Sequence, residues 1–502
     1  MGGPLARLLA SRVGLFLALL AGVLLPLAYA PIDWVWLSLL SPALLFAIAA
    51  AAPLKRALWA AYLFGLGYFT VGTSWVFVSI SRYGTGPVVA AVVTTIFMAV
   101  LALFPWAAVY IGRKLRPQRD GLLLWLAFPL AWLLAEWVRS WLLTGFPWLL
   151  LGYSQTDTWL GHLAPVTGVF GISLVVAILA GGLAWLLLRP SVRRGAAFAV
   201  AFVVAIGGSL LLARDWTEPS GEPLSVALLQ GNIEQDKKWS ADYFETTLRR
   251  YWALNAEHLG ADIIVWPEAA IPAWYHQVED NYLARVLERG REAGSSVVMG
   301  IPVLEPDNSA YNAVVSLGEA PEFYHKRHLV PFGEYLPLRS IFGNLLDILG
   351  APMSDFSVGQ GVPEPITAAG VPVGASVCYE AAFGDEIAAV LPAAEILVNV
   401  SNDAWFGDSL APHQHLQMMR MRAMETEREV LRATNTGITA IIDHQGRIRA
   451  STPQFVETSL TGQATPRQGA TPYVRWLNYP VLIVVFAGLV ALLGLHWRQR
   501  PS

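Results

Sequence analysis

The sequence has little charge and almost no cysteine, and both shortages narrow the range of functions. Only 14% of its 502 residues are charged, whereas a soluble globular protein usually carries about 25%. With 55% hydrophobic residues and a mean hydropathy of +0.47, the composition excludes a cytosolic enzyme and a disordered chain. The net charge of −3 provides no basic field for phosphate backbones, which excludes a nucleic-acid binder.

The one cysteine, Cys378, excludes an internal disulfide in any compartment. This residue is therefore a lone core residue, a metal ligand without companions, or a nucleophile. Nothing else in the sequence requires a metal or a cofactor. Tryptophan, in contrast, is abundant: 20 indoles are typical of a protein with many membrane interfaces, where this side chain prefers to lie.

Apolar runs long enough to cross a bilayer, about 18 residues or more, occur repeatedly. They predict eight spans, at about 13–30, 34–52, 57–80, 87–112, 121–138, 164–188, 195–213 and 478–495. The first run also fits a signal peptide, because Arg7 and Arg12 precede it and Ala28-Tyr29-Ala30 resembles a cleavage site. We expect this helix to be kept as a span, as is common in multi-span proteins.

The short connections between these runs carry their positive charges on one side. Two cations, Arg82 and Arg139, lie on the opposite set of loops. The favoured set holds thirteen: Arg7, Arg12, Lys55, Arg56, Arg113, Lys114, Arg116, Arg119, Arg189, Arg193, Arg194, Arg498 and Arg500. Since Lys and Arg are retained in the cytoplasm, the count predicts that both termini are cytoplasmic and that the long segment before the last span lies outside.

This outer segment, about 215–476, has a different composition and the length of one independent domain. Short β-rich runs alternate with amphipathic helical stretches, which predicts an α/β domain. The predicted strands lie at 224–233, 261–266, 295–304, 311–317, 371–378, 395–400 and 437–443, and the predicted helices at 243–259, 281–294 and 414–433. The chain is thus expected to comprise a seven-span domain (1–214), this domain (215–476), and an eighth span with a tail (477–502).

Three residues of the outer segment form a candidate catalytic set. Cys378 and Glu268 each end a predicted strand, where α/β folds place reactive groups. A thiol needs a base or a cation nearby to become a thiolate, and Glu268 and Lys326 supply both. Taken singly, the cysteine would more often be a small buried hydrophobe and the other two would be surface charges.

Four motifs resemble those of a known family. They are Trp-Pro-Glu at 266–268, Lys-Arg-His-Leu-Val-Pro-Phe-Gly-Glu at 326–334, Cys-Tyr-Glu at 378–380 and Ser-Asn-Asp-Ala-Trp-Phe-Gly at 401–407. The order Glu, Lys, Cys, with intervals of 58 and 52 residues, is similar to the nitrilase superfamily. The whole set, on a multi-span frame, resembles its membrane-bound branch, apolipoprotein N-acyltransferase.

The resemblance implies an α-β-β-α sandwich and a two-step acyl transfer, the last step of lipoprotein maturation in the bacterial inner membrane, with the active site on the periplasmic side. Cys378 would attack the sn-1 ester of a phospholipid, expected to be phosphatidylethanolamine, to give a thioester. The α-amine of the S-diacylglyceryl cysteine of an apolipoprotein would then take the acyl chain. Glu268 would serve as the base, and Lys326 would hold the oxyanion together with the backbone N–H of Tyr379.

Further residues receive expected roles from the same resemblance. Glu334, Tyr379 and Glu380 correspond to supporting positions around the site, although Glu334 alone would also fit a surface residue or a helix cap. Trp239 corresponds to a tryptophan that family members need, and we expect it to bind substrate. A core or interface aromatic is the alternative for Trp239.

Two segments are candidates for lipid contact. Trp148, in the outer loop after the fifth span, is expected to line the path of the lipid, with an aromatic belt as the alternative. The apolar segment 336–349, which includes Phe342 and Leu345, is expected to be a mobile arm that dips into the outer leaflet. An amphipathic helix buried in the domain is the alternative for this segment. Near the outer end of the fifth span, Glu136 and Arg139 are expected to form an ion pair on one helix face.

Two other functions remain open at this level. A membrane-tethered amidase or nitrile hydrolase would use the same three residues but would let water enter second. It would have no evident use for the apolar segment 336–349. A transporter would fit the eight spans, but the spans carry almost no central charges that could coordinate an ion or a substrate.

Overall fold

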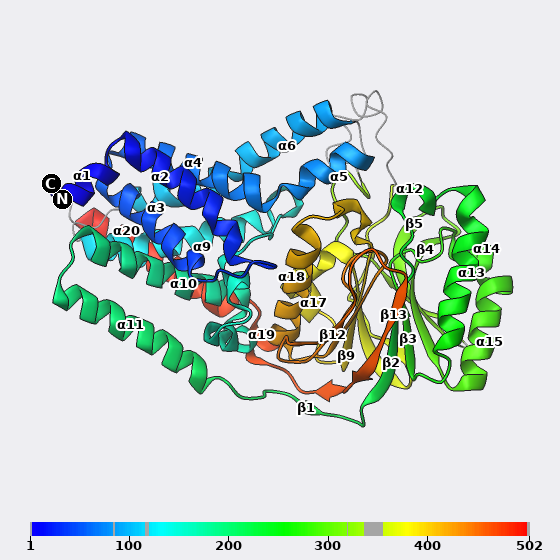
Figure 1. The fold of residues 1–502 in the computed structure, drawn as a ribbon. Helices are drawn as coiled ribbons and strands as arrows, with labels where there is room; N and C mark the ends of the chain where they lie inside the picture. Colours follow the sequence, from blue (N-terminus) through cyan, green and yellow to red (C-terminus); the bar gives the residue numbers. More distant parts are fainter. Residues whose placement is uncertain (1–2, 84–85, 116–119, 319, 336–354, 499–502) are drawn as a thin grey trace. The chain divides into compact units, whose positions relative to one another are not determined.

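The computed structural model describes residues 3–83, 86–115, 120–318, 320–335 and 355–498. The chain forms two compact units (Figure 1). The helical unit comprises Met1–Phe77, Ala91–Arg214 and Trp476–Ser502. The α/β unit comprises Val78–Ala90 and Asp215–Arg475. The short stretch 78–90 belongs to the second unit because it packs there, with the Ser79 hydroxyl donating to the Trp405 carbonyl at 2.7 Å.

Each predicted apolar run falls on helical structure. The main helices are α2 (Arg12–Leu24) with η1 (Leu25–Ala28), α3 (Leu37–Ala51), α4 (Leu54–Gly72), α5 (Trp75–Tyr83), α6 (Pro87–Leu101), α7 (Leu103–Lys114), α9 (Phe128–Arg139), α10 (Ala164–Leu188), α11 (Val192–Leu211) and α20 (Tyr479–Arg498). Among the described residues, five helices are long and apolar enough to cross a membrane, or six if the 55° bend between α4 and α5 interrupts a single span. The α2 and α3 segments are apolar but shorter, so the count of eight stays a prediction.

Small residues let the helices of this unit approach closely. A Cβ atom on Gly22 of α2 would collide with the backbone of Phe64 in α4, so only glycine fits at this crossing. The last helix, α20, joins helices that lie far away in sequence: Phe486 packs edge-on against Trp137 of α9, with ring centroids 5.7 Å apart. The C-terminal span is therefore part of the same packed bundle as the first seven apolar runs.

A largely buried stretch, 145–155, which ends in the 3₁₀ helix η4 (Leu151–Gln155), lies between α9 and α10 and is held by side chains. Arg139 donates to the carbonyls of Phe146 and Trp148 at 2.7 and 2.6 Å. Glu136 accepts from the Leu151 N–H at 2.9 Å. Among the described residues, no contact within 4.0 Å joins the expected pair Glu136 and Arg139; each side chain binds loop backbone, which otherwise lacks partners in an apolar setting.

Two six-stranded sheets form the frame of the α/β unit. One sheet has the order β13-β2-β3-β4-β5-β6 and the other β12-β11-β10-β9-β8-β7. The first sheet contains β2 (Leu224–Gln230), β3 (Ile263–Trp266), β4 (Ser296–Leu304), β5 (Ala310–Leu317), β6 (Glu322–His325) and β13 (Thr458–Ala464). The second contains β7 (Ile366–Ala368), β8 (Val371–Val377), β9 (Ile396–Ser401), β10 (Val430–Thr434), β11 (Ala440–Ile442) and β12 (Ile448–Ser451).

The two sheets pack face to face, and helices cover both outer faces (Figure 1). Apolar side chains of β2, β3, β8 and β9 fill the layer between the sheets. On the outer face of the first sheet lie α13 (Ala241–Glu257) and α15 (Ala284–Ala293), and on that of the second lie α17 (Gly384–Ala388) and α18 (Ala411–Thr426). The predicted α-β-β-α sandwich is confirmed.

Boundary predictions failed where short strands carry weak patterns. The predicted helix 414–433 ends at Thr426, because Glu427 adopts a left-handed conformation (φ +46°) and the chain continues as β10. Strands β6, β7, β12 and β13 were also missed. Two of them, β12 and β13, are partly exposed and rich in Thr, Ser, Arg and Gly, so the alternation of apolar residues that marks a strand is faint.

Candidate active site

Three strand ends bring the candidate catalytic residues to one place. Glu268 follows β3 and Lys326 follows β6, both in the first sheet, whereas Cys378 follows β8 of the second sheet. All three side chains are buried, with 8%, 1% and 7% of their residues' surfaces exposed. The prediction that Glu268 and Cys378 end strands is confirmed, whereas the strand before Lys326, β6, was not predicted.

Glu268 is held in a tight turn against the neighbouring strand. A Cβ atom on Gly300 of β4 would lie 2.6 Å from the Glu268 Cα, so glycine is required for this close approach. The next residue, Ala269, has a φ of +44°, which non-glycine residues rarely adopt. The carboxylate accepts a hydrogen bond from the Asn312 amide at 2.7 Å, so its direction is fixed.

Lys326 lies between two carboxylates. Its Nζ is 2.8 Å from one oxygen of Glu334 and 3.9 Å from Glu268. Burial alone lowers the pKa of Lys326, but Glu334 and Glu268 outweigh it, so the net pKa lies above the usual range. Asn312 also donates to Glu334 at 2.8 Å and thus links both carboxylates. Lys326 therefore remains a buried cation at neutral pH.

Cys378 has a strained backbone and a neutral thiol. Its φ of +50° is a left-handed conformation that costs a non-glycine residue roughly 1–2 kcal/mol. Burial raises the pKa of the thiol, Glu268 raises it further, and Lys326 opposes both. The thiol consequently stays protonated until a base removes its proton, and Glu268 and Lys326 are the charged groups with the largest effect on it.

Glu380 organises the loops around the thiol. It accepts from the backbone N–H groups of Val377 and Arg327, at 2.6 and 2.7 Å, and from the Tyr324 hydroxyl at 2.8 Å. These bonds tie the segment that follows β8 to the segment that follows β6. Glu380 is the acceptor in each of these hydrogen bonds. It therefore supports the loops and does not donate to a substrate.

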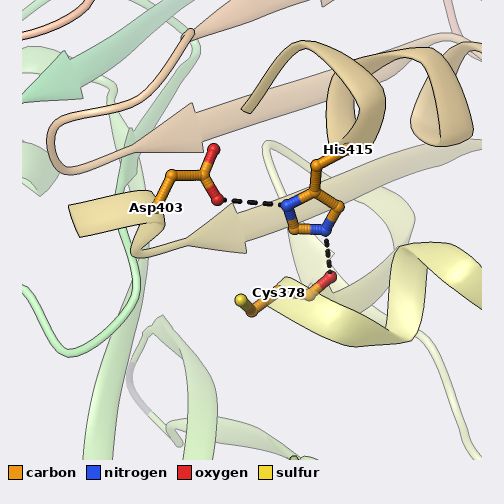
Figure 2. A group of neighbouring side chains, drawn as sticks. All are labelled: Cys378, Asp403 and His415. Carbon is orange, nitrogen blue, oxygen red and sulfur yellow. Dashed lines mark hydrogen bonds and ion pairs between the residues drawn. The ribbon is translucent and has the colours of Figure 1, made fainter. Parts of the chain in front are cut away.

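A second buried network adjoins Cys378 on the side of α18 (Figure 2). His415 Nε2 lies 2.9 Å from the Cys378 carbonyl oxygen, and His415 Nδ1 lies 3.1 Å from Asp403. Arg432 donates to Asp403 at 2.9 Å. Burial alone raises the pKa of Asp403, but Arg432 and then His415 more than reverse this and hold it well below its usual range.

Cys378, Asp403 and His415 are also the one group of described residues whose spacing would suit a metal ion. Their partners argue against that use. One imidazole nitrogen faces a main-chain carbonyl, and the guanidinium of Arg432 lies 3.0 Å from the other. A cation already neutralises the carboxylate, so the group is a hydrogen-bond network and fits a metal poorly.

A second lysine, Lys238, is buried beside the site. It ends the short helix α12 (Gln235–Lys238), and its Nζ donates to the Glu268 carbonyl at 3.0 Å. Burial lowers its pKa to about 8, against the opposing influence of Glu268 and Cys378. Lys238 thus holds the main-chain carbonyl of Glu268, the expected base.

The remaining predicted residues have different surroundings. Trp239 is 56% exposed, so its ring is available to a ligand. Trp148 is fully buried in the helical unit, with its ring 4.8 Å from that of Trp75. A lipid contact at Trp148 would require its side chain to become accessible, and that role stays a prediction. Phe342 and Leu345 lie outside the described residues.

Sequence reasoning missed the polar residues that hold the candidate site together, namely Asn312, Asp403, His415, Arg432 and Lys238. Some signal was available. Asn312 and Arg432 lie inside strands, where asparagine is uncommon and a buried arginine needs partners. Asp403 lies within one of the four motifs, yet the sequence does not reveal which side chain it contacts.

Comparison with known proteins gives matches over both units. Residues 21–182 match the apolipoprotein N-acyltransferase N-terminal domain, and residues 225–472 match the carbon-nitrogen hydrolase family. An apolipoprotein N-acyltransferase from Methylococcus capsulatus is 48% identical over 97% of each chain. One from Coxiella burnetii is 40% identical over 95% of this chain and 99% of its own. The crystal structure of a carbon-nitrogen hydrolase from Helicobacter pylori G27 is 14% identical, covers 48% of this chain and 88% of its own, and has a TM-score of 0.36.

Proposed function

Because this chain belongs to the apolipoprotein N-acyltransferase family, we propose that it acylates lipoproteins through a thioester on Cys378. The protein is a membrane-bound acyltransferase of the carbon-nitrogen hydrolase superfamily, with a lipid donor and a lipoprotein acceptor. The proposal concerns the steps of the reaction and the residues that perform them.

In the first half-reaction, Glu268 takes the proton from the Cys378 sulfur, and the thiolate attacks the sn-1 ester carbonyl of a phospholipid. The carbonyl oxygen becomes an oxyanion, which Lys326 and the Tyr379 backbone N–H stabilise. The bond between the acyl carbon and the glycerol oxygen then breaks. Glu268 returns its proton to that oxygen, which leaves a lysophospholipid and a thioester.

In the second half-reaction, the α-amine of an S-diacylglyceryl cysteine attacks the thioester carbonyl. Glu268 accepts a proton from the amine, the carbon–sulfur bond breaks, and the thiolate of Cys378 regains a proton from Glu268. The product is an amide. Glu334 supports this cycle by keeping Lys326 charged and in position, Glu380 by holding the loops, and Trp239 by offering an exposed ring to substrate.

The single observation that carries this proposal is the buried cation Lys326 between two carboxylates, beside the only thiol in the chain. The test is mass spectrometry of the purified protein after incubation with phosphatidylethanolamine, the expected donor. We expect one fatty acyl group on Cys378 that hydroxylamine removes. Addition of a diacylglyceryl-cysteine peptide should then transfer the group to the peptide, whereas release as free fatty acid would favour a hydrolase.

We propose the membrane arrangement that the charge count predicts: eight spans, both termini in the cytoplasm, and residues 215–476 on the periplasmic side of the bacterial inner membrane. Five long apolar helices, one bent pair and two shorter apolar helices support the count. Single cysteines at Ser191 and Ser502, in a Cys378→Ala background, should resist an impermeant thiol reagent in intact cells. A cysteine at Ser220 should react, and the opposite pattern would refute the orientation.

A further inference from the structure

We propose that His415 is a positioning residue for the oxyanion site: it fixes the peptide group between Cys378 and Tyr379 and so aims the Tyr379 N–H at the reacting carbonyl. The inference rests on the proposed thioester mechanism, in which this N–H shares the oxyanion with Lys326. His415 neither exchanges a proton with the thiol nor contacts the substrate; it acts through the main-chain carbonyl of Cys378.

The bond from His415 determines its tautomer. The Cys378 carbonyl oxygen can only accept, so His415 Nε2, at 2.9 Å, carries the hydrogen. His415 is 1% exposed, so water does not compete for this bond. Figure 2 shows the imidazole reaching down from α18 toward the main chain of Cys378, with the sulfur on the other side of the residue.

The carbonyl that His415 holds and the proposed oxyanion donor belong to the same peptide group. A peptide unit is planar, and its C=O and N–H point in opposite directions. Fixing the Cys378 oxygen therefore fixes the direction of the Tyr379 N–H. A hydrogen bond on the carbonyl also polarises the unit, which makes its N–H a stronger donor.

The backbone of Cys378 requires such a restraint. Its φ of +50° is disfavoured for residues with a Cβ atom, and conformations of this kind persist only where the surroundings hold them. Glu380 restrains the preceding segment through the Val377 N–H at 2.6 Å. His415 restrains the following peptide, so the two side chains hold the nucleophile from both sides.

His415 can perform this task because its own ring is fixed. Nδ1 lies 3.1 Å from Asp403 and 3.0 Å from the Arg432 guanidinium. Asp403 in turn accepts from the Ser401 hydroxyl at 2.8 Å and from Arg432 at 2.9 Å. All of these groups are buried, so the imidazole has one orientation.

The test compares two amide substitutions that differ in reach. His415→Gln places an amide N–H near the position of Nε2 and can still donate to the Cys378 carbonyl. His415→Asn places its amide near Nδ1, keeps a polar group beside Asp403 and Arg432, and cannot reach the carbonyl. His413→Leu, on the same helix, removes a partly buried histidine that contacts Gln454 and is the control.

Two rates separate an effect on the oxyanion from an effect on the thiol. One is the single-turnover rate of acyl-Cys378 formation from phosphatidylethanolamine; the other is alkylation of Cys378 by iodoacetamide, which generates no oxyanion. We expect His415→Asn to slow acylation about ten- to hundredfold with an unchanged KM for phospholipid. His415→Gln should stay within about fivefold of the parent, and all variants should be alkylated at the same rate.

Several outcomes would overturn the proposal: parental acylation in His415→Asn, equal losses in the Asn and Gln variants, or alkylation that slows in parallel with acylation. Loss of a cooperative thermal transition in both variants would assign His415 to the fold and would equally overturn it. Absence of any acyl-enzyme in the parental protein is a different result, because it would refute the thioester mechanism itself.

Discussion

Arg139 in the helical unit and Lys326 in the α/β unit use their buried charges in opposite ways. In the helical unit, buried cationic and hydroxyl groups donate to main-chain carbonyls: Arg139 binds those of Phe146 and Trp148, and Tyr68 binds that of Leu149. In the α/β unit, the buried cation Lys326 faces two carboxylates, Glu334 and Glu268, whereas the neighbouring Lys238 binds a carbonyl. The helical unit thus satisfies irregular backbone, whereas the α/β unit concentrates charge around one reacting atom.

The group that a buried charge binds determines whether its loss changes the stability of the protein or the rate of the reaction. A side chain that binds a carbonyl away from the reacting atoms stabilises one backbone path, and its loss lowers the free energy of unfolding. A charge beside a thiol changes the free energy of the thiolate and of the oxyanion, and its loss slows the acylation reaction. Substitutions of Arg139 and Lys326 can therefore be distinguished by whether they alter the stability of the protein or the rate of the reaction.

The largest effect is expected at the thiol itself. Cys378→Ala should abolish the acyl-enzyme, because no second cysteine exists to replace it, and Cys378→Ser should be nearly inactive because an alkoxide is far harder to form. Mass spectrometry after incubation with phospholipid measures both. Normal turnover by Cys378→Ala would show that Cys378 is not the nucleophile.

The charges beside the thiol should come next. Glu268→Gln and Lys326→Met should each slow acylation by at least about two orders of magnitude, the usual scale for a general base or an oxyanion donor. Single-turnover kinetics with phosphatidylethanolamine measures the rates, and the melting temperature of each variant serves as the control. Losses below tenfold in both variants would contradict the assigned roles.

In the helical unit, Arg139→Gln should alter stability far more than rate. The substitution removes two charge-assisted bonds to buried carbonyls, worth on the order of 4 kcal/mol together. Thermal unfolding in detergent measures the loss, with the exposed Arg193→Gln as the matched control. A large fall in acylation per folded molecule, with stability unchanged, would show that this network also serves the reaction.

Lys238 is a buried cation of the α/β unit that binds a main-chain carbonyl, as Arg139 does in the helical unit. Its pKa is about 8 in the folded protein, against 10.5 for a lysine side chain in water. Between these values the unfolded chain binds more protons than the folded one, so the folded state gains stability as pH rises. Below about pH 8 this gain is absent.

Lys238→Met removes the titration. The unfolding free energy of the parent should therefore rise, relative to that of Lys238→Met, by up to about 3 kcal/mol from pH 7 to pH 10.5. Thermal unfolding across this range measures both free energies. Lys237→Met, at the exposed neighbouring position, is the control and should show no such trend up to about pH 10. If the difference in unfolding free energy between Lys238→Met and the parent did not change with pH, the pKa of Lys238 would not be lowered in the folded protein.

The fold was largely predictable from the sequence because its strongest signals are local. Apolar runs locate the helices, and strands such as β4 and β8 carry long buried patterns that follow directly from their apolar residues. The edge strands were not predictable, since their residues are partly exposed and their pairing depends on partners far away. The helix predicted up to residue 433 ran into β10, an inner strand whose residues are all buried, because the sequence does not reveal the left-handed conformation of Glu427 that ends the helix.

The sequence predicted the residues of the candidate site that lie in recognisable motifs, but not the contacts that hold these residues in place. Glu268, Lys326 and Cys378 follow from residue type, strand ends and resemblance. The link from Asn312 to both carboxylates, and the link from His415 to the Cys378 carbonyl, depend on the packing of two sheets and a helix. Such contacts join positions far apart in the chain and leave no periodic trace in the sequence.

The pairing of β13 with β2 has a consequence for how the protein is made. Strand β13 completes the sheet that carries Glu268, although more than two hundred residues separate it from β2. The last helix, α20, likewise completes the helical unit against α9. Neither unit can close before the ribosome has synthesised β13 and α20, and an open sheet edge invites wrong pairing. A chain terminated before β13 is therefore incomplete in both units at once.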